Sequence, residues 1–280
     1  MNKWNLIIDV ARCENCHNCT LALKDEFESN EFPGYSMPQP RHGHQWIRIE
    51  RKVRGEKIMV DAAYLPSMCN HCDNAPCVAK SNSAINKRDD GIVIIDPIKA
   101  KGRKDLIDTC PYGNIWWNED HQVPQSWFFD AHLLDQGWSE PRCSQSCPTG
   151  ALKALKISDD EMNEIVKNDG LEVLRPEFDT KPRIYYKNLH RFDKCFIGGS
   201  VVAQLCGVEE CISGAIVILS HEDKEVERLV TDDFGDFKFD NITPGSGNYV
   251  IEIQHSDFGK ARLIGEVYEE SLYLGDVCLS

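Results

Sequence analysis

The sequence predicts an α+β chain with two parts, a loop-rich N-terminal part built around cysteines and a small antiparallel β-sandwich at the C-terminal end. Two observations support this prediction. The cysteines of two short runs and two Cys-Pro pairs all lie before about residue 155. From about residue 196, short apolar runs alternate with turns rich in Asp, Gly, Pro and Asn, which is typical of a β-sandwich. The 280 residues are enough for one or two domains.

The cysteine spacing predicts the chemistry of the first part. In bacterial ferredoxins, three closely spaced thiolates hold most of one 4Fe–4S cube, and a distant cysteine before proline supplies the fourth ligand. We therefore expect a ferredoxin-like double 4Fe–4S domain over residues 1–155. The pattern here consists of Cys13-x2-Cys16-x2-Cys19, Cys69-x2-Cys72-x4-Cys77, Cys110-Pro111 and Cys147-Pro148.

A zinc site is the alternative for these cysteines. A single Cys-x2-Cys pair is also typical of a zinc knuckle. The third cysteine in each run and the two Cys-Pro pairs favour iron–sulfur ligation. The alternative function from another class is thus a zinc-stapled, non-redox scaffold that carries a sandwich interaction module.

Composition limits the partners and the compartment. The formal net charge of −14 and the pI near 5.1 argue against nucleic acid and anionic membrane surfaces as partners. The odd number of cysteines, thirteen, and their grouping indicate metal ligation in a reducing compartment, so we expect a cytoplasmic protein. The first motif, at Cys13, leaves no room for a signal peptide. The longest apolar stretches, such as Gly214 to Leu219, are too short to span a membrane.

The expected elements follow in order. Short strands are predicted at Trp4 to Asp9, Trp46 to Glu50 and Ile92 to Ile95. Residues 156–195 form a bridge, in which Ser158 and Glu161 make a capping-box signature. This signature predicts a helix that ends near Gly170, after which two prolines favour an extended segment as far as Tyr186.

The C-terminal part, residues 196–280, has four clear strand signals. They lie at residues 215–219, 237–239, 249–253 and 272–274. The pattern resembles prealbumin-like or carboxypeptidase-regulatory-like sandwich domains, which usually bind or brace.

Several stretches of the chain resemble the iron–sulfur (β) subunits of the dimethyl-sulfoxide-reductase family of molybdenum enzymes. Over nearly the whole chain, the similarity is greatest to the small subunits of transhydroxylases in that family. Family members have four runs of four cysteines, and each cube takes three ligands from one run and the fourth from its partner run. The stretches that carry the resemblance are NHCDNAPCVAK, GIVIIDPIKAKGRKDLIDTCPYG, AHLLDQG, PRCSQSCP and KPRIYYKNLHRF.

The resemblance implies two complete ligand sets out of four. One cube would take Cys13, Cys16, Cys19 and Cys147, and another Cys69, Cys72, Cys77 and Cys110. A third slot falls on Ser81, Ala100, Arg103 and Leu106, and a fourth on Leu23, Trp127, Asp130 and Cys143. All the missing cysteines fall in these last two slots, so we expect two cubes.

The resemblance also implies a partner. A large subunit would carry the substrate and molybdenum with molybdopterin guanine dinucleotide, and this chain would form a heterodimer with it. The expected function is electron transfer in an enzyme that transfers hydroxyl groups between polyhydroxylated aromatics. The alternative is electron delivery to a reductive dehydroxylase or another molybdenum reductase. We expect no catalytic residue in this chain.

The remaining candidates have plain interpretations. Cys143, Cys195, Cys206, Cys211 and Cys278 are expected to behave as small buried hydrophobes. His17 and His71 lie inside the cysteine loops, where packing or an N–H donated to cluster sulfur is expected. Either a solvated surface or an acidic partner face is expected for the basic residues Arg41, His42, His44, Arg48, Arg51, Lys52 and Arg54.

Overall fold

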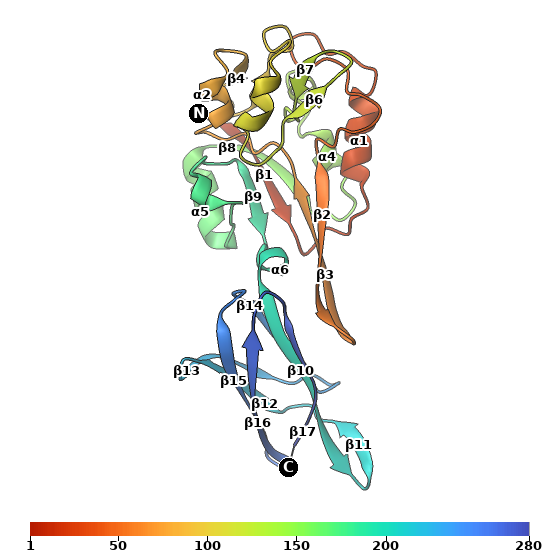
Figure 1. The fold of residues 1–280 in the computed structure, drawn as a ribbon, viewed down its shortest axis with the longest axis vertical. Helices are drawn as coiled ribbons and strands as arrows, with labels where there is room; N and C mark the ends of the chain where they lie inside the picture. Colours follow the sequence, from red (N-terminus) through yellow and green to blue (C-terminus); the bar gives the residue numbers. More distant parts are fainter. Residues whose placement is uncertain (280) are drawn as a thin grey trace. The chain divides into compact units, whose positions relative to one another are not determined.

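The computed structural model describes residues 1–279, and it divides into two compact units (Figure 1). Unit 1 consists of Met1–Glu50 and Tyr64–Leu189. Unit 2 consists of Arg51–Ala63 and the chain from His190 onward. Strands predominate and helices are few and short, which gives a mixed α+β composition as predicted.

Unit 1 is organised by a three-stranded sheet of order β8-β1-β9. The central strand β1 (Lys3–Asp9) matches the strand predicted at Trp4 to Asp9. It runs antiparallel to β8 (Leu152–Ile157) and parallel to β9 (Ile184–Lys187). Its interior residues are buried, so the first strand of the chain lies at the centre of this unit.

Two helices of unit 1 have clear sequence origins. Helix α1 (Asn18–Phe27) begins inside the first cysteine run and buries Cys19, Leu23 and Phe27. Helix α5 (Asp159–Asp169) has the predicted capping box, in which Ser158 and Glu161 satisfy each other's backbone N–H groups. It ends at Gly170, whose φ of 61° is readily adopted by glycine.

Short elements make up most of the remainder of unit 1. A small apolar core lies between these elements; it includes Ala84, Ile85, Val93, Ala100 and Leu106. The elements are α2 (Pro76–Lys80), β4 (Ile85–Lys87), β5 (Val93–Ile95), η1 (Lys104–Thr109), β6 (Trp116–Asn118), β7 (Val123–Gln125), α3 (Ala131–Leu134), α4 (Arg142–Gln145) and η2 (Pro176–Phe178).

A long hairpin formed by β2 (Arg48–Glu56) and β3 (Met59–Ser67) extends the strand predicted at Trp46 to Glu50. Its tip belongs to unit 2, where Met59 packs so closely on Gly198 that a Cβ would not fit there. Arg54 lies over the Phe196 ring at 5.4 Å and pairs with Asp61 and Asp240. The hairpin tip is therefore a packed part of unit 2.

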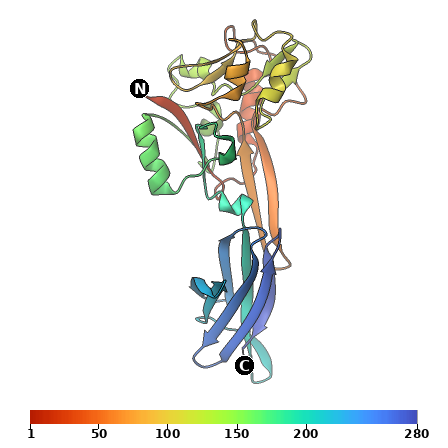
Figure 2. The ribbon, with the colours of Figure 1, turned by 60° about the vertical axis from the view of Figure 1, so that its left-hand side comes forward.

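Unit 2 contains two four-stranded sheets (Figures 1 and 2). One has the order β11-β10-β14, with β17 pairing β10, and the other has the order β13-β12-β15-β16. Residues of both sheets, among them Phe239 and Ile251, belong to one buried core. Apart from the short helix α6 (His190–Asp193), the elements are β10 (Cys195–Leu205), β11 (Val208–Cys211), β12 (Ile216–His221), β13 (Lys224–Val230), β14 (Asp236–Ile242), β15 (Gly247–His255), β16 (Gly259–Val267) and β17 (Leu272–Cys278).

The four predicted C-terminal strands coincide with β12, β14, β15 and β17. Strand β10 was not predicted because residues 195–203 are buried on both faces and show no alternation of polar and apolar residues. Within residues 1–279, no helix is long and apolar enough to cross a membrane.

Candidate iron–sulfur centres

The first group of cysteines comes from two distant segments. Cys13, Cys16 and Cys19 lie in the loop after β1 and in the first turn of α1, and Cys147 lies between α4 and β8. The pKa of the Cys13 thiol is raised by burial and, to a smaller extent, by the neighbouring Cys147 and Cys16. Burial raises the pKa of Cys19 to about 11, and Cys13 and Cys147 add to this effect. The four thiols therefore lie near one another, although they come from two segments.

Backbone and hydroxyl donors also point at the first group. Asn15 has a left-handed φ of 56°, and its N–H donates to the Cys13 sulfur. Burial alone would raise the pKa of Cys147, but the N–H groups of Leu152, Ala151 and Thr149 outweigh it, and the pKa is lowered. The Thr149 hydroxyl lies 3.6 Å from the Cys147 sulfur. Such donors stabilise a thiolate over a thiol.

The second group is assembled in the same way. Cys69 and Cys72 lie in the loop after β3, Cys77 lies in α2, and Cys110 follows η1. Burial raises the pKa of Cys77 to about 12, and Cys110 and Cys72 add to the shift. The pKa of Cys69 is raised first by burial and then by Cys110 and Cys77.

These two groups suit 4Fe–4S clusters in their donor chemistry. Each offers four sulfurs, and a cube is held at four separate irons, so its cysteines surround a volume instead of converging on one point. Among residues 1–279, no three His, Cys, Asp or Glu side chains form a group that would hold a single metal ion. Thiols with a raised pKa lose their protons when metal binds, which links cluster binding to pH. The assignment of ligands to each cluster stays a prediction.

An ion-pair network braces the loop of the second group. The side chain of Arg183 is only 3% exposed, and its Nε donates to Asp73 Oδ1 at 2.7 Å. A second nitrogen, Nη2, donates to Asp159 Oδ1 at 2.8 Å, in the first turn of α5. The Lys87 ammonium donates to the His71 carbonyl at 2.9 Å and to Asp73 at 2.8 Å. The loop is therefore tied to β4, to α5 and to the residue that precedes β9.

The fourth slot is filled by protein side chains. Leu23, Trp127, Asp130 and Cys143 are each at most 2% exposed. The indole N–H of Trp127 donates to Asp130 Oδ1 at 3.0 Å, and the Arg142 N–H donates to Oδ2 at 2.8 Å. Burial raises the pKa of Asp130 to about 6, against the effect of these two donors. We call this slot closed, because its residues are buried and both Asp130 oxygens accept hydrogen bonds.

The third slot is also occupied. Ala100 and Leu106 are fully buried in the small apolar core, and the Ser81 hydroxyl donates to the Val78 carbonyl at 2.9 Å. Arg103 donates to the Ser81 carbonyl at 3.1 Å. These residues serve packing and local hydrogen bonding.

The two histidines of the loops differ. His17 is exposed. His71 is buried, and its Nδ1 accepts the Val93 N–H at 3.0 Å, so its Nε2 carries the proton when the ring is neutral. Burial lowers the pKa of His71 to about 3, which keeps the ring neutral near pH 7. Its Nε2 has no partner within the described structure, and the donation to cluster sulfur stays a prediction.

Two expectations about other residues were wrong in part. Cys206, Cys211 and Cys278 are exposed, because they lie in a turn, on an edge strand and at a strand end, whereas Cys143 and Cys195 are buried as predicted. Of the basic residues near position 48, His44 and Arg54 are buried, at 5% and 4% exposed, so these two cannot belong to a solvated surface or a partner face.

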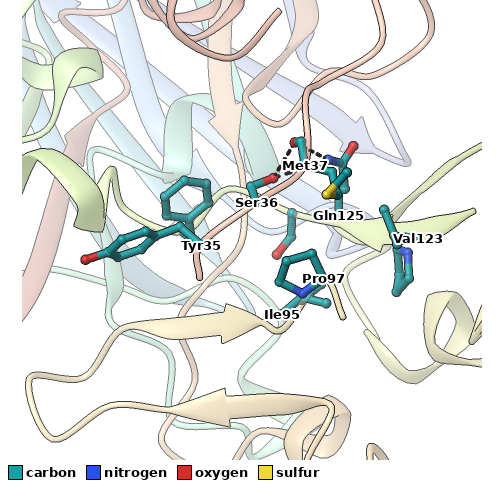
Figure 3. A pocket seen from close by; sticks show the side chains of 10 residues that line it. Tyr35, Ser36, Met37, Ile95, Pro97, Val123 and Gln125 are labelled. Atoms are coloured by element: carbon teal, nitrogen blue, oxygen red, sulfur yellow. Dashed lines mark hydrogen bonds between the residues drawn. The ribbon is translucent and has the colours of Figure 1, made fainter. Parts of the chain in front are cut away.

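A cavity beneath residues 35–37 is too small for a substrate (Figure 3). Tyr35, Ser36 and Met37 line one side of it and Val123 another. The Gln125 side-chain amide donates to Ser36 Oγ at 3.2 Å and to the Met37 carbonyl at 2.7 Å. Its volume of about 10 Å³ leaves room for one water at most.

Comparison with known proteins defines the class of this chain. A profile described as a 4Fe-4S dicluster domain matches residues 60–157. One tetrathionate reductase subunit, from Salmonella typhimurium, is 31% identical over 67% of this chain and 73% of the relative. A putative dimethyl sulfoxide reductase iron–sulfur subunit from Halobacterium salinarum is 28% identical over 67% of this chain and 80% of the relative. These matches define an electron-transfer subunit with iron–sulfur clusters.

A further relative aligns almost end to end. The pyrogallol hydroxytransferase small subunit of Pelobacter acidigallici is 43% identical over 279 residues, which cover 99% of this chain and 96% of the relative. The chain therefore belongs to the family of iron–sulfur subunits of molybdenum enzymes that includes this small subunit. The family predicted from the sequence is confirmed.

Proposed function

We propose that this chain holds two 4Fe–4S clusters as the electron-transfer subunit of a heterodimeric molybdenum enzyme. The observation that carries the proposal is the assembly of two groups of four cysteines from distant segments, while the residues of the other two slots, except for the half-exposed Arg103, are buried. The proposed ligands are Cys13, Cys16, Cys19 and Cys147 for one cluster, and Cys69, Cys72, Cys77 and Cys110 for the other.

The role of this chain is to bind and orient the clusters. When bound, each cluster accepts and releases one electron at a time. The backbone N–H groups of Asn15 and Leu152 donate to the sulfurs of Cys13 and Cys147, and burial keeps water from Cys19 and Cys72. Molybdenum, its pterin cofactor and the substrate would all be bound by the large partner subunit.

Hydroxyl transfer between polyhydroxylated aromatics is the proposed reaction of the complex. It is supported by the alignment with the small subunit of a pyrogallol hydroxytransferase and by the closed fourth slot at Trp127 and Asp130. In the subunits that this chain resembles, the slots lie in a line and the closed one separates the two retained here. A reaction that balances its electrons within one active site does not need a continuous row of clusters.

Electron delivery to a reductase is the second candidate. The similarity to the tetrathionate reductase subunit favours it. Iron–sulfur potentials depend on hydrogen bonding and exposure, so a redox measurement is required to decide between the two candidates.

The finer architecture belongs to the same proposal. Residues 1–155 would form the double ferredoxin domain, residues 156–195 the bridge, and residues 196–280 a β-sandwich that braces the complex. The one core shared by the two sheets of unit 2 supports the sandwich. We place the complex in the cytoplasm because the grouped cysteines need a reducing compartment.

Metal analysis tests the proposal directly. Protein purified without oxygen should contain about eight iron and eight acid-labile sulfide per chain. About twelve of each would contradict the closed fourth slot. Zinc without sulfide would overturn the iron–sulfur function, and the absence of a molybdenum-binding subunit from the purified complex would overturn the heterodimer.

A further inference from the structure

Lys87 places a charge against the loop of residues 69–72, which joins two proposed ligands of the second group. Its ammonium donates to the carbonyls of His71 and Gly91, both at 2.9 Å, and pairs with Asp73 Oδ1 at 2.8 Å. An ammonium has three N–H groups, and these three oxygens surround it. Burial lowers the pKa of Lys87 and the pairing with Asp73 opposes this shift, so the amine stays protonated near pH 7.

The hairpin that carries Lys87 makes a second contact with the same loop. Lys87 is the last residue of β4 and pairs with Val93 of β5. The Val93 N–H donates to His71 Nδ1 at 3.0 Å. His71 has a left-handed φ of 45°, which a residue with a Cβ keeps only where its surroundings impose it. The distance between the ammonium and the loop is therefore set by the fold.

The segment before β9 also holds the loop. The N–H groups of Asp73 and Asn74 donate to the carbonyls of Lys181 and Thr180, both at 2.9 Å. Arg183 ends this segment, and its Nε donates to Asp73 Oδ1 at 2.7 Å. The Asp73 carboxylate therefore has a fixed position between two cations.

The charges around Asp73 do not cancel. Its carboxylate pairs with Lys87 and Arg183, and the Lys3 ammonium lies 3.9 Å away. Asp159, the second carboxylate of this network, pairs with Arg183 at 2.8 Å and with Lys3 at 2.7 Å. Three cations thus face two carboxylates, which leaves one positive charge in excess. The side chains of Arg183 and Lys87 are only 3% and 21% exposed, so water screens this excess less than at an open surface.

We propose that the Lys87 ammonium is a fixed positive charge that raises the reduction potential of the cluster held by Cys69, Cys72, Cys77 and Cys110. Reduction adds an electron to a cluster that its four thiolates already make anionic, and a positive charge beside the ligand loop stabilises the added charge. Asp73 acts in the opposite sense, because its carboxylate offsets part of the positive charge. Lys87 is not a ligand and acts only through its charge. The inference rests on the proposed function, which supplies the cluster.

The test is a redox titration followed by electron paramagnetic resonance on the complete protein with its partner. Lys87→Met removes the charge and keeps the stem, so it should make the midpoint potential of one cluster more negative. Asp73→Asn removes a negative charge and keeps the shape, so it should make the potential of the same cluster less negative. Lys87→Arg retains the charge and should stay closer to the original potential than Lys87→Met. The signal that disappears in Cys110→Ser identifies the cluster.

Lys24→Met is the matched control. Lys24 is also partly buried and also donates to a backbone carbonyl, that of Pro40 at 2.9 Å, but it lies in α1, outside the second group. The variant should leave the potential of the identified cluster unchanged. An equal shift in Lys24→Met and Lys87→Met would show that the effect is not specific to the charge beside the loop, and would overturn the proposal.

The opposite signs separate charge from structure. Lys87→Met and Asp73→Asn break the same ion pair, so a loosened loop that exposes the cluster would shift both potentials in one direction. Shifts of the same sign overturn the proposal, as do full iron content and unchanged potentials in Lys87→Met. If one of the two variants loses the cluster, the sign of the shift in the other decides. A wild-type protein that binds no cluster would instead refute the proposed function.

Discussion

At the scale of single residues, Cys147 and Cys110 complete the two proposed clusters from a distance. Cys147→Ser should therefore weaken the cluster of Cys13, Cys16 and Cys19 and leave the other intact, and Cys110→Ser should do the reverse. Iron content and paramagnetic resonance of each variant measure the effect.

The control for these variants is Cys143→Ser. Cys143 is fully buried but has only Leu23, Trp127 and Asp130 as slot companions, so its loss should leave about eight irons in place. Loss of the Cys69 cluster in Cys147→Ser would show that the pairing is wrong.

The closed fourth slot gives a second prediction. Cys143 already provides one sulfur there, and the triple change Leu23→Cys, Trp127→Cys, Asp130→Cys would provide the other three. Iron per chain should rise from about eight to about twelve. Trp127→Cys alone should stay at about eight, because two sulfurs cannot hold a cube. A triple variant that folds and binds no additional iron would mean that this slot is not shaped for a cluster.

The sequence shows the proposed ligand residues but not the groups around them. Cys13 and Cys69 are recognisable because ligand spacing is local in the chain. Thr180 is not, because its hydrogen bonds with Tyr112 and Asn74 depend on how the segment before β9 returns to the cysteine loop. The exposure of Cys211 could not be predicted from the sequence either, because it depends on β11 being an edge strand.

At the scale of elements, local signals predicted α5 and failed for β10. The capping box at Ser158 acts through neighbouring backbone groups, so the sequence alone shows it. Strand β10 is buried by its sheet partners and by the hairpin tip at Met59, and none of these contacts is local. Burial on both faces removes the alternation that marks a strand.

The hairpin tip gives a prediction about pH. Burial opposes ionisation of Asp61, but hydrogen bonds from Arg191 and Arg54 and the charge of Lys238 hold its pKa well below the usual range. A depressed pKa stabilises the folded state above the unfolded value of about 3.9, and this contribution is lost as the pH falls further. Asp61→Asn should therefore destabilise unit 2 at pH 7, by about 3 kcal/mol, and by less at pH 3.

Hydrogen exchange of β10 and β14 peptides across a urea series measures this effect. Glu225→Gln is the control, because its ion pair with Arg228 is exposed and should matter little at either pH. Equal destabilisation by Asp61→Asn at both pH values would contradict the assigned role of the Asp61 charge.

At the scale of the whole molecule, the resemblance implies that the closed slot lies between the two proposed clusters. We expect slow electron exchange between them, because a packed indole and carboxylate occupy the position where the resemblance implies a further cluster slot. Stopped-flow reduction of the heterodimer, sampled by rapid-freeze paramagnetic resonance, should show one cluster reduced well before the other. Reduction of both clusters and of molybdenum within one turnover would favour the electron-delivery candidate.

The position of β1 has a consequence for the order of synthesis. Lys3 pairs with Ile157 and Leu6 with Ile184, so β1 leaves the ribosome long before its partners, which are made near the end of unit 1. At about 5–20 residues per second, roughly 10 to 30 s pass before these partners are available. During that interval the apolar residues of β1 have no sheet to join, and a nascent chain stalled before residue 152 should be a client of chaperones that shield unpaired strands.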